Sequence, residues 1–467
     1  MNIVLINPPH PKPRDPYYFY PMGIASIIAF LDQQGYSSEF IDFYYHMDTA
    51  DGWTKIRESL SGKNPDLIGI TIYTETRGPA LQLVSLIKKL FPRACIIAGG
   101  PHASPMAMQI LQHHPVDAIV IGEGEITFLE IVKTLESRQS FEQVDGLAYK
   151  DARGQIRMNK PRALIPDLDM LPMPAYHHFN LKTADLISAG MQVVFSRGCP
   201  FRCVFCSESA FWGNKFRAKS VAACIDEMEF LVAHYRINKF IIYDALLSVN
   251  KKRALDFCEA LTARKLPVTW GARLRADLAD TDILESFKKA GCIGISYGVE
   301  SGSQKVLDLI NKKVTIDQIE KAFDLTHQAG LTAEASIMVG NPGESITSIW
   351  GTDRLLKRIK PDRVYIIPTK IYPGTPLHES AKKKKIIDDD YWLSEKPVPH
   401  FTDRLTAKEI YFYIGLLRQN KFSDNKARFW NFANLTIYCR QFLSVILLFV
   451  RFFLNRLKLT GTTGARQ

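Results

Sequence analysis

The sequence predicts an α/β protein: a doubly wound parallel sheet of five strands, a partial (β/α)6 barrel of the TIM type, and a helical C-terminal tail. Two observations predict the folded part. Continuous apolar runs alternate with amphipathic helical patterns, and this alternation occurs twice, on either side of a proline-rich stretch. The 467 residues are 46% hydrophobic and 23% charged, which excludes collagen-like and disordered classes.

The first alternating series, residues 1–140, predicts the doubly wound domain. Its apolar runs are continuous, as is typical of parallel strands that helices bury on both faces. The expected strands cover residues 2–9, 38–43, 67–73, 94–102 and 118–125, and the expected helices cover residues 22–35, 80–92, 105–114 and 128–137. Because no G-x-G-x-x-G motif follows the first strand, a dinucleotide site is not expected.

The second series, residues 191–400, predicts the partial barrel. Before it, residues 141–190 contain a hairpin-like start and four prolines between positions 161 and 174, which indicate an extended linker. The expected strands cover residues 191–198, 239–244, 268–274, 293–301, 332–340 and 363–372, and the expected helices cover residues 221–235, 251–264, 282–291 and 315–330. In such barrels the chemistry gathers at the carboxyl ends of the strands.

Residues 401–467 are expected to form a helical region that carries most of the net charge of +11. The last 50 residues hold nine Lys or Arg and one acidic residue, so a uniformly basic nucleic-acid-binding surface is not expected. Residues 434–459 are apolar but interrupted by Arg440 and Arg451. This pattern favours an amphipathic helix on a membrane surface over a spanning helix. The alternative is a helix docked on the barrel.

The start of the chain and the cysteines indicate the compartment. The segment MNIVLINPP lacks a basic region and is interrupted by prolines, so we expect no signal peptide and a cytoplasmic protein, with the tail at the inner face of the membrane. Eight cysteines in such a chain do not indicate a disulfide framework. Five of them stand singly and are expected to pack in cores.

The other three cysteines follow the first barrel strand, in MQVVFSRGCPFRCVFCSES (191–209). Cys199, Cys203 and Cys206 have C-x3-C-x2-C spacing, so three thiolates from one tight loop can bind one face of a cubane iron–sulfur cluster. Zinc sites usually have four protein ligands, and no suitable fourth is near in sequence. Three thiolates leave one iron open for a substrate or cofactor. The alternatives are a zinc loop and three core cysteines.

This cysteine loop and several later segments resemble the radical SAM superfamily. The later segments are GARLRADL (271–278), YGVESGS (297–303), MVGNPGES (338–345) and IYPGTPL (371–377). The resemblance implies that the three cysteines hold a [4Fe-4S] cluster whose open iron binds S-adenosylmethionine. It also implies reductive cleavage of that cofactor to a 5′-deoxyadenosyl radical.

The same resemblance implies residues that contact S-adenosylmethionine. Phe205 is expected to pack on the adenine, with a core aromatic as the alternative. Glu300 is expected to accept hydrogen bonds from the ribose or ammonium group, and Arg275 (or Arg273) to bind the carboxylate. Asp244 is the fourth residue that is expected to contact S-adenosylmethionine. Ala245 follows it where relatives often have a second acid, so no role is expected for a second acid. The catalytic side chains stay unassigned.

The first domain resembles the cobalamin-binding domain that precedes the barrel in one class of this superfamily. The matching residues follow the expected strands, where open sheets bind ligands. The expected cobalamin contacts are Asn7, Thr74, Gly99, Gly100, His102, Gly122, Glu123 and Gly124. The motif Asp-x-His-x-x-Gly, whose histidine ligates cobalt, is absent, so His102 is expected to contact the corrin rim rather than the metal. The alternative is a domain that binds no cofactor.

These resemblances imply a cobalamin-dependent radical SAM enzyme that methylates an unactivated carbon of a small-molecule or lipid substrate. The expected partner is an electron donor such as flavodoxin or ferredoxin. One alternative is a radical cyclase or rearrangement enzyme without net methyl transfer. The other is a cobalamin or iron–sulfur sensor without turnover.

Overall fold

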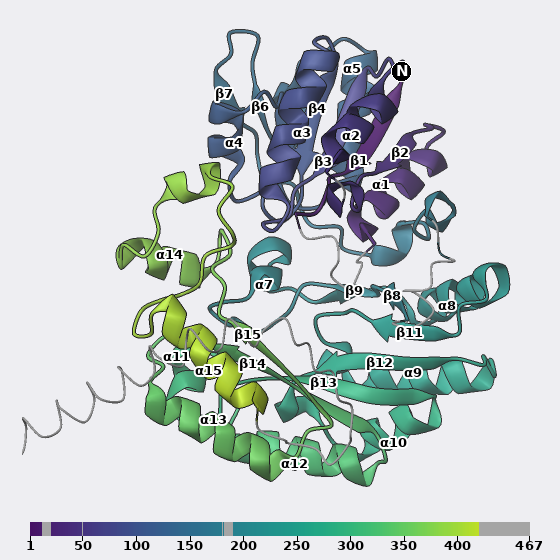
Figure 1. Cartoon of the computed structure of the whole chain (residues 1–467). Coiled ribbons are helices and arrows are strands. Elements are labelled where there is room, and N and C mark those ends of the chain that lie inside the picture. The colour runs from purple at the N-terminus through teal and green to yellow at the C-terminus, as the bar shows by residue number, and fades with distance from the viewer. Residues whose placement is uncertain (12–19, 49, 180, 182–189, 420–467) are drawn as a thin grey trace, which may run out of the picture. The chain divides into compact units, whose positions relative to one another are not determined.

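The computed structural model describes residues 1–11, 20–48, 50–179, 181 and 190–419, which all belong to one compact unit, Met1–Ser423. Within this unit, two sheets are each flanked by helices (Figure 1). The predicted α/β fold class is confirmed. The domain boundaries near residues 140, 190 and 400 stay predictions. The apolar basic segment 434–459 lies outside the described residues, and no helix in the described part is long and apolar enough to cross a membrane.

The N-terminal sheet contains the five predicted parallel strands. They are β1 (Ile3–Asn7), β2 (Glu39–Asp42), β3 (Leu67–Thr71), β4 (Cys95–Gly99) and β5 (Ala118–Val120). Their order in the sheet is β2-β1-β3-β4-β5, so the order reverses between β1 and β3. Ligands of open parallel sheets bind at the carboxyl ends of the strands beside such a reversal.

Helices cover both faces of this sheet. They are α1 (Met22–Gln33), α2 (Gly52–Leu60), α3 (Arg77–Leu90), α4 (Ala107–His113) and α5 (Glu125–Glu136). Alternate residues of β1 belong to different cores: Ile3 and Leu5 pack with α1 and α5, whereas Val4 and Ile6 pack with α2, α3 and α4. This two-sided burial is the reason why the strand is continuously apolar in sequence.

The sheet also extends into the segment expected as a linker. β6 (Leu147–Lys150) pairs antiparallel with β5, and β7 (Ile156–Met158) pairs antiparallel with β6. The N-terminal sheet therefore has seven strands and is mixed. Only residues after this hairpin run between the two sheets.

The second sheet is the predicted partial barrel of six parallel strands. Its strands are β8 (Met191–Val193), β11 (Lys239–Ile242), β12 (Thr269–Leu274), β13 (Cys292–Glu300), β14 (Thr332–Val339) and β15 (Arg363–Pro368). They lie in the order β15-β14-β13-β12-β11-β8. Two short antiparallel strands, β9 (Ser196–Arg197) and β10 (Arg217–Ala218), flank the cysteine loop.

The described helices of the second half are α7 (Ser207–Trp212), α8 (Val221–Tyr235), α9 (Lys251–Ala263), α10 (Thr281–Lys289), α11 (Gln304–Leu309), α12 (Ile316–Gln328), α13 (Ile346–Ile359), α14 (Pro376–Lys383) and α15 (Ala407–Gln419). They include all four helices that were predicted there, which are α8, α9, α10 and α12. Thr315 and Gln318 form a reciprocal capping box at the start of α12.

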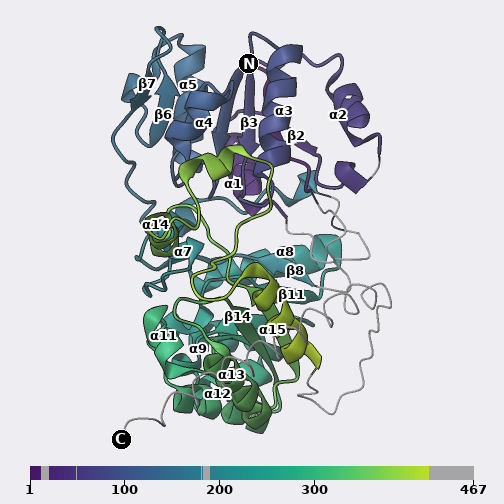
Figure 2. The same ribbon diagram turned by 60° about the vertical axis from the view of Figure 1, so that its left-hand side comes forward.

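The chain returns to the N-terminal sheet after β15. Ile371, Leu377, Trp392 and Phe401 join the core that α2, α3 and α4 form on that sheet. Both views show the segment around α14 running beside the N-terminal helices (Figures 1 and 2). We call residues 371–401 the return segment. It fixes the N-terminal sheet to the barrel by apolar burial.

Candidate active site

The cysteine loop is held by the β9–β10 pair. Arg197 of β9 pairs with Arg217 of β10, and the loop between them carries the cysteines and α7. Gly198 lies between β9 and Cys199 with a φ of +83°, and a Cβ there would meet the Lys215 carbonyl oxygen at 2.3 Å. Only glycine fits this close approach, so the residue before the first cysteine sets the direction of the loop.

The three loop thiols are free and largely shielded from solvent. Cys203 is buried, and Cys199 and Cys206 are half-buried. Burial raises the pKa of all three, to about 11 for Cys206. A thiol with such a pKa stays protonated at neutral pH unless a metal binds it. Three thiols from one loop therefore fit the donor set of an iron–sulfur cluster.

Two of the four residues expected to contact S-adenosylmethionine lie around Cys203. Arg275 and Glu300, together with Lys312, are the charged groups that act on the Cys203 thiol. Arg275 donates to Asp277 Oδ1 at 2.9 Å and to the Lys312 carbonyl oxygen at 2.7 Å. Lys312 Nζ donates to Glu300 Oε1 at 3.1 Å. The structure therefore brings Arg275 and Glu300 together beside the cluster loop.

The other two expected residues have structural contacts. Asp244 is buried at the end of β11 and accepts the backbone N–H groups of Phe195 and Ser196 at 2.7 and 3.0 Å. It thereby fixes the chain that leads to the cysteines. Burial raises the pKa of this carboxyl. Phe205 packs against both the barrel core and the core that contains the return segment.

A cavity of about 680 Å³ lies between the carboxyl ends of the N-terminal strands and the barrel. Seven of the eight residues expected to bind cobalamin line it: Asn7, Thr74, Gly99, Gly100, Gly122, Glu123 and Gly124. From the barrel side it is lined by Ser207, Glu208 and Trp212, which follow the last cysteine of the loop. The cavity thus reaches from the predicted cobalamin contacts to the residues just after Cys206, whereas the three cysteines, Arg275 and Glu300 do not line it.

The glycines keep the N-terminal wall of the cavity free of side chains. Gly122 has a φ of +79°, and a Cβ on it would meet nothing within 4 Å. Gly100 has a φ of +102°, and its Cβ would lie 2.9 Å from Thr71 Oγ1. A large planar cofactor needs such bare backbone to approach the strand ends, so the residues present fit a corrin.

His102, the eighth expected residue, does not line the cavity. It is 1% exposed, its Nδ1 lies 3.3 Å from Thr74 Oγ1, and its ring packs edge-on against Trp392. Burial, reinforced by Arg77, lowers its pKa to about 3, so the imidazole is neutral. The structure places His102 behind Thr74, whose side chain it can orient, and its contact with the corrin rim stays a prediction.

Glu123 belongs to a buried ion-pair network that joins the N-terminal sheet to the β9–β10 pair. It accepts from Arg197 Nη1 at 2.7 Å, from Arg217 Nη1 at 2.9 Å and from the backbone N–H of Ile165 at 2.7 Å. Glu125 binds Arg197 as well. Burial opposes the charge of Glu125, but Arg197 outweighs it and leaves the pKa below the usual value. The network ties β9 and β10 to the Gly122–Gly124 loop.

A polar cluster at the barrel side of the cavity was missed by the sequence analysis. Tyr372 Oη donates to Glu75 Oε1 at 2.7 Å, and Lys370 Nζ lies 3.3 Å from the same oxygen. Nearby, the guanidinium of Arg273 lies 3.8 Å from the ring centroid of Tyr243. Tyr372 belongs to the IYPGTPL segment, but nothing in the sequence links it to Glu75. We call Glu75, Lys370 and Tyr372 the polar cluster.

Comparison with known proteins agrees with this geometry. The sequence matches the radical SAM superfamily over residues 193–356 and the B12 binding domain over residues 15–132. It is 30% identical over 397 residues to an uncharacterized methyltransferase of Pyrococcus horikoshii, covering 83% of this chain and 85% of that protein. It is 31% identical over 397 residues to an anaerobic magnesium-protoporphyrin IX monomethyl ester cyclase of Rubrivivax gelatinosus, covering 82% and 71%.

Solved structures agree on the fold. The radical S-adenosylmethionine methyltransferase TsrM from Kitasatospora setae superposes with a TM-score of 0.71 at 19% identity, over 82% of this chain and 76% of that one. The chain therefore belongs to the radical SAM superfamily, in the class with an N-terminal B12-binding domain, and it is a cobalamin-dependent enzyme that uses a [4Fe-4S] cluster and S-adenosylmethionine.

Proposed function

We propose that this enzyme methylates an unactivated carbon of a small-molecule or lipid substrate. The observation that carries the proposal is that the glycine loops of the B12-binding domain and the end of the cysteine loop line the same cavity. A substrate held there lies between the two cofactor sites. Radical formation on one side and methyl transfer from the other need that placement, because reacting atoms must be held within contact distance.

Within this proposal, the residues have separate tasks. Cys199, Cys203 and Cys206 hold the cluster, and Arg275 and Glu300 bind S-adenosylmethionine next to Cys203. The bare loops with Asn7, Thr74 and Glu123 hold cobalamin. When bound, the cluster and S-adenosylmethionine supply a 5′-deoxyadenosyl radical, and methylcobalamin supplies the methyl group.

The polar cluster is the proposed anchor for a polar group of the substrate. Lys370 and Tyr372 come from the chain that follows β15, and Glu75 comes from the loop after β3, so the cluster faces the cavity from both halves. Its ammonium, hydroxyl and carboxylate groups can orient one polar end of a substrate. The apolar side chains of the cavity then receive the carbon skeleton.

A cyclisation without net methyl transfer is the second candidate. The 31% identity to a magnesium-protoporphyrin IX monomethyl ester cyclase favours it, because that relative is matched over 71% of its length. The same cavity serves either reaction. An electron donor such as flavodoxin or ferredoxin is the proposed partner in both cases.

Product analysis separates the candidates. The full chain is reconstituted anaerobically with iron, sulfide and cobalamin, reduced, and incubated with S-adenosylmethionine and candidate substrates. Methyl transfer is expected to yield both 5′-deoxyadenosine and S-adenosylhomocysteine. Deoxyadenosine alone with a converted substrate supports cyclisation, and neither product from a loaded, reduced enzyme supports the sensor alternative and overturns the proposal.

A further inference from the structure

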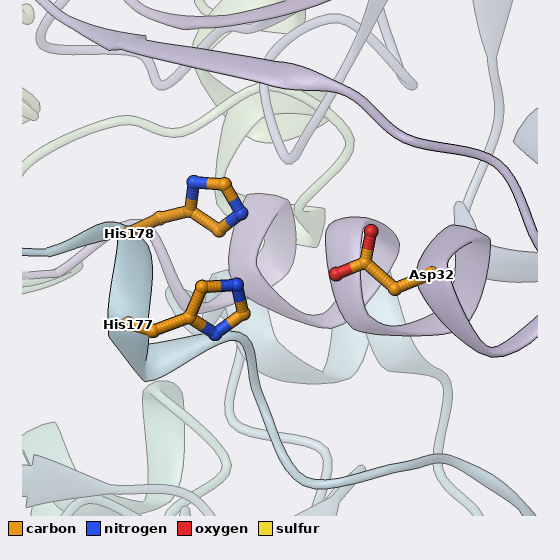
Figure 3. Close-up of side chains that lie close together, drawn as sticks. All are labelled: Asp32, His177 and His178. Carbon is orange, nitrogen blue, oxygen red and sulfur yellow. The ribbon is translucent and has the colours of Figure 1, made fainter.

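Two adjacent histidines and a distant aspartate converge outside the cavity. Asp32 lies near the end of α1, and His177 and His178 lie in η4, a short 3-10 helix (Tyr176–His178) that precedes the barrel. One donor atom from each lies within 4.8 Å of the other two. Figure 3 shows both imidazole rings on the side of η4 that faces the Asp32 carboxylate.

This convergence is unusual for neighbours in a 3-10 helix. Such a helix has about three residues per turn, so consecutive side chains normally point about 120° apart. Here the ring centroids of His177 and His178 are 4.3 Å apart, with 42° between the ring planes. Among the described residues, none of the three side chains has a hydrogen bond or ion pair that would explain the arrangement.

The backbone of η4 is fixed on both sides. The N–H of Ala175 donates to the Ala25 carbonyl oxygen of α1 at 3.1 Å, and the Phe179 ring packs against Tyr20 and Phe40. On the barrel side, Tyr176 Oη donates to the buried Glu227 Oε1 of α8 at 2.6 Å. The two histidines are therefore presented to Asp32 by a rigid support, which a metal site needs.

The donor set suits a transition-metal ion. Two imidazole nitrogens and one carboxylate oxygen are ligands that Zn²⁺ takes at about 2.0–2.2 Å, whereas Mg²⁺ and Ca²⁺ prefer oxygen alone. Ligand atoms of a tetrahedral site lie about 3.4 Å apart at such bond lengths, so small side-chain rotations complete this one.

We propose that Asp32, His177 and His178 bind one divalent transition-metal ion, with Zn²⁺ as the ion to test, and water in the remaining position. The ion joins α1 of the B12-binding domain to η4, which in turn is bound to α8 of the barrel. It thereby stabilises the junction on which the geometry of the cavity depends. This site is separate from the cysteine loop and does not depend on the reaction proposed above.

The test measures zinc bound to the holoenzyme with its cluster already reconstituted, so that the thiols are occupied. After equilibrium dialysis against Zn²⁺, elemental analysis is expected to find one zinc per chain. His178→Gln and Asp32→Asn are expected to weaken zinc binding at least tenfold. X-ray absorption at the zinc edge is expected to show nitrogen and oxygen ligands without sulfur.

His113 and His114 supply a matched control, because they are also adjacent and have the same exposure, one exposed and one half-buried. His113→Gln/His114→Gln is expected to retain the zinc. Circular dichroism verifies that each variant is folded. Equal zinc retention in His178→Gln and wild type, equal loss in the control, or sulfur ligation would each overturn the proposal.

Discussion

At the scale of single residues, the site depends on how burial changes charge. The loop thiols are held protonated by burial, while two cations, Arg275 and Lys312, lower the cost of a thiolate at Cys203. The cysteines must lose their protons when a cluster binds. Burial opposes this loss at all three thiols, and the two cations favour it at Cys203. Cys203 is also the most deeply buried of the three thiols.

Replacing Cys203 with alanine is expected to abolish cluster binding, because two thiols from this loop cannot hold a four-iron cluster firmly. Iron and sulfide content after anaerobic reconstitution, and the absorption of the cluster near 400 nm, measure the effect. Cys258→Ala is the control, since Cys258 is also buried but lies in the barrel core. Equal iron content in both variants would contradict the assignment.

Glu344 predicts a pH dependence of stability. Its Oε2 accepts the N–H groups of Gly340 and Asn341, but Oε1 is buried without a partner. Burial raises its pKa to about 7. Because the folded state holds this proton more tightly than the unfolded state, protonated Glu344 makes its full contribution to the free energy of unfolding below about pH 4.5. It falls as the pH rises to about 7, by roughly 3 kcal/mol.

Glu344→Gln, which imitates the protonated carboxyl, is expected to remove this dependence. The variant should exceed wild type in free energy of unfolding at pH 8 by roughly 2–3 kcal/mol and match it near pH 4.5. Urea unfolding at several pH values measures this. The exposed Glu58→Gln should leave the profile unchanged. A parallel profile for Glu344→Gln and wild type would disprove the buried titration.

At the scale of elements, the strands were predicted more accurately than the helices, of which the 14-residue α13 was also missed. Every predicted strand is present, because a continuous apolar run identifies a buried strand without information about the strands it pairs with. Helix α7 was missed because SESAFW is short and follows the cysteines directly. Helix α2 was missed because only Gly52, Ile56 and Leu60 of its nine residues are buried, although Ile56 and Leu60 stand four positions apart. Both depend on tertiary packing rather than on local propensity.

Gly122→Ala tests the bare loop after β5. Alanine at a φ of +79° is expected to cost about 1–2 kcal/mol, and its methyl group enters the cavity, so cobalamin affinity should fall. Gly154→Ala is the control, with a φ of +74° and the same open surroundings but a position in the β6–β7 turn. It should cost the same stability and leave cobalamin binding, measured by absorption titration, unchanged. Equal affinities would exclude Gly122 from the site.

At the scale of the whole molecule, the cavity exists because two sheets far apart in sequence are held together. The Glu123 network joins β9 and β10 to the B12-binding domain, and the return segment packs onto the same domain from the other direction. Removing one member of a buried ion pair typically costs about 3–5 kcal/mol. The junction therefore constrains the cavity on two independent sides.

Trp392→Ala is expected to weaken the return segment. Trp392 is 1% exposed, donates to His378 Nε2 at 3.2 Å, and lies under the Arg77 guanidinium. The expected cost is about 3–5 kcal/mol, together with weaker cobalamin binding because Arg77 also holds the Thr74 carbonyl oxygen. Thermal unfolding and cobalamin titration measure both. Trp350→Ala, at a tryptophan that is 51% exposed, should change neither. A stable Trp392→Ala enzyme would show that the segment is dispensable.

The sequence by itself determined the order of the strands, the α/β class and the spacing of the three thiols. These are local properties: periodicity, turn residues and a loop of eight residues carry them without reference to the rest of the chain. It also indicated the glycine loops, because strands of a parallel sheet all end on one edge.

Only the tertiary structure decided which of those residues face the cavity. His102 lies behind Thr74 because Trp392, nearly 300 residues later, packs against it. Glu123 meets two arginines, and Glu75 meets Tyr372, through contacts between domains that no spacing encodes. Side-chain direction and ion pairing depend on the packing of distant elements, and this packing is settled by burial of the whole core rather than by any one segment.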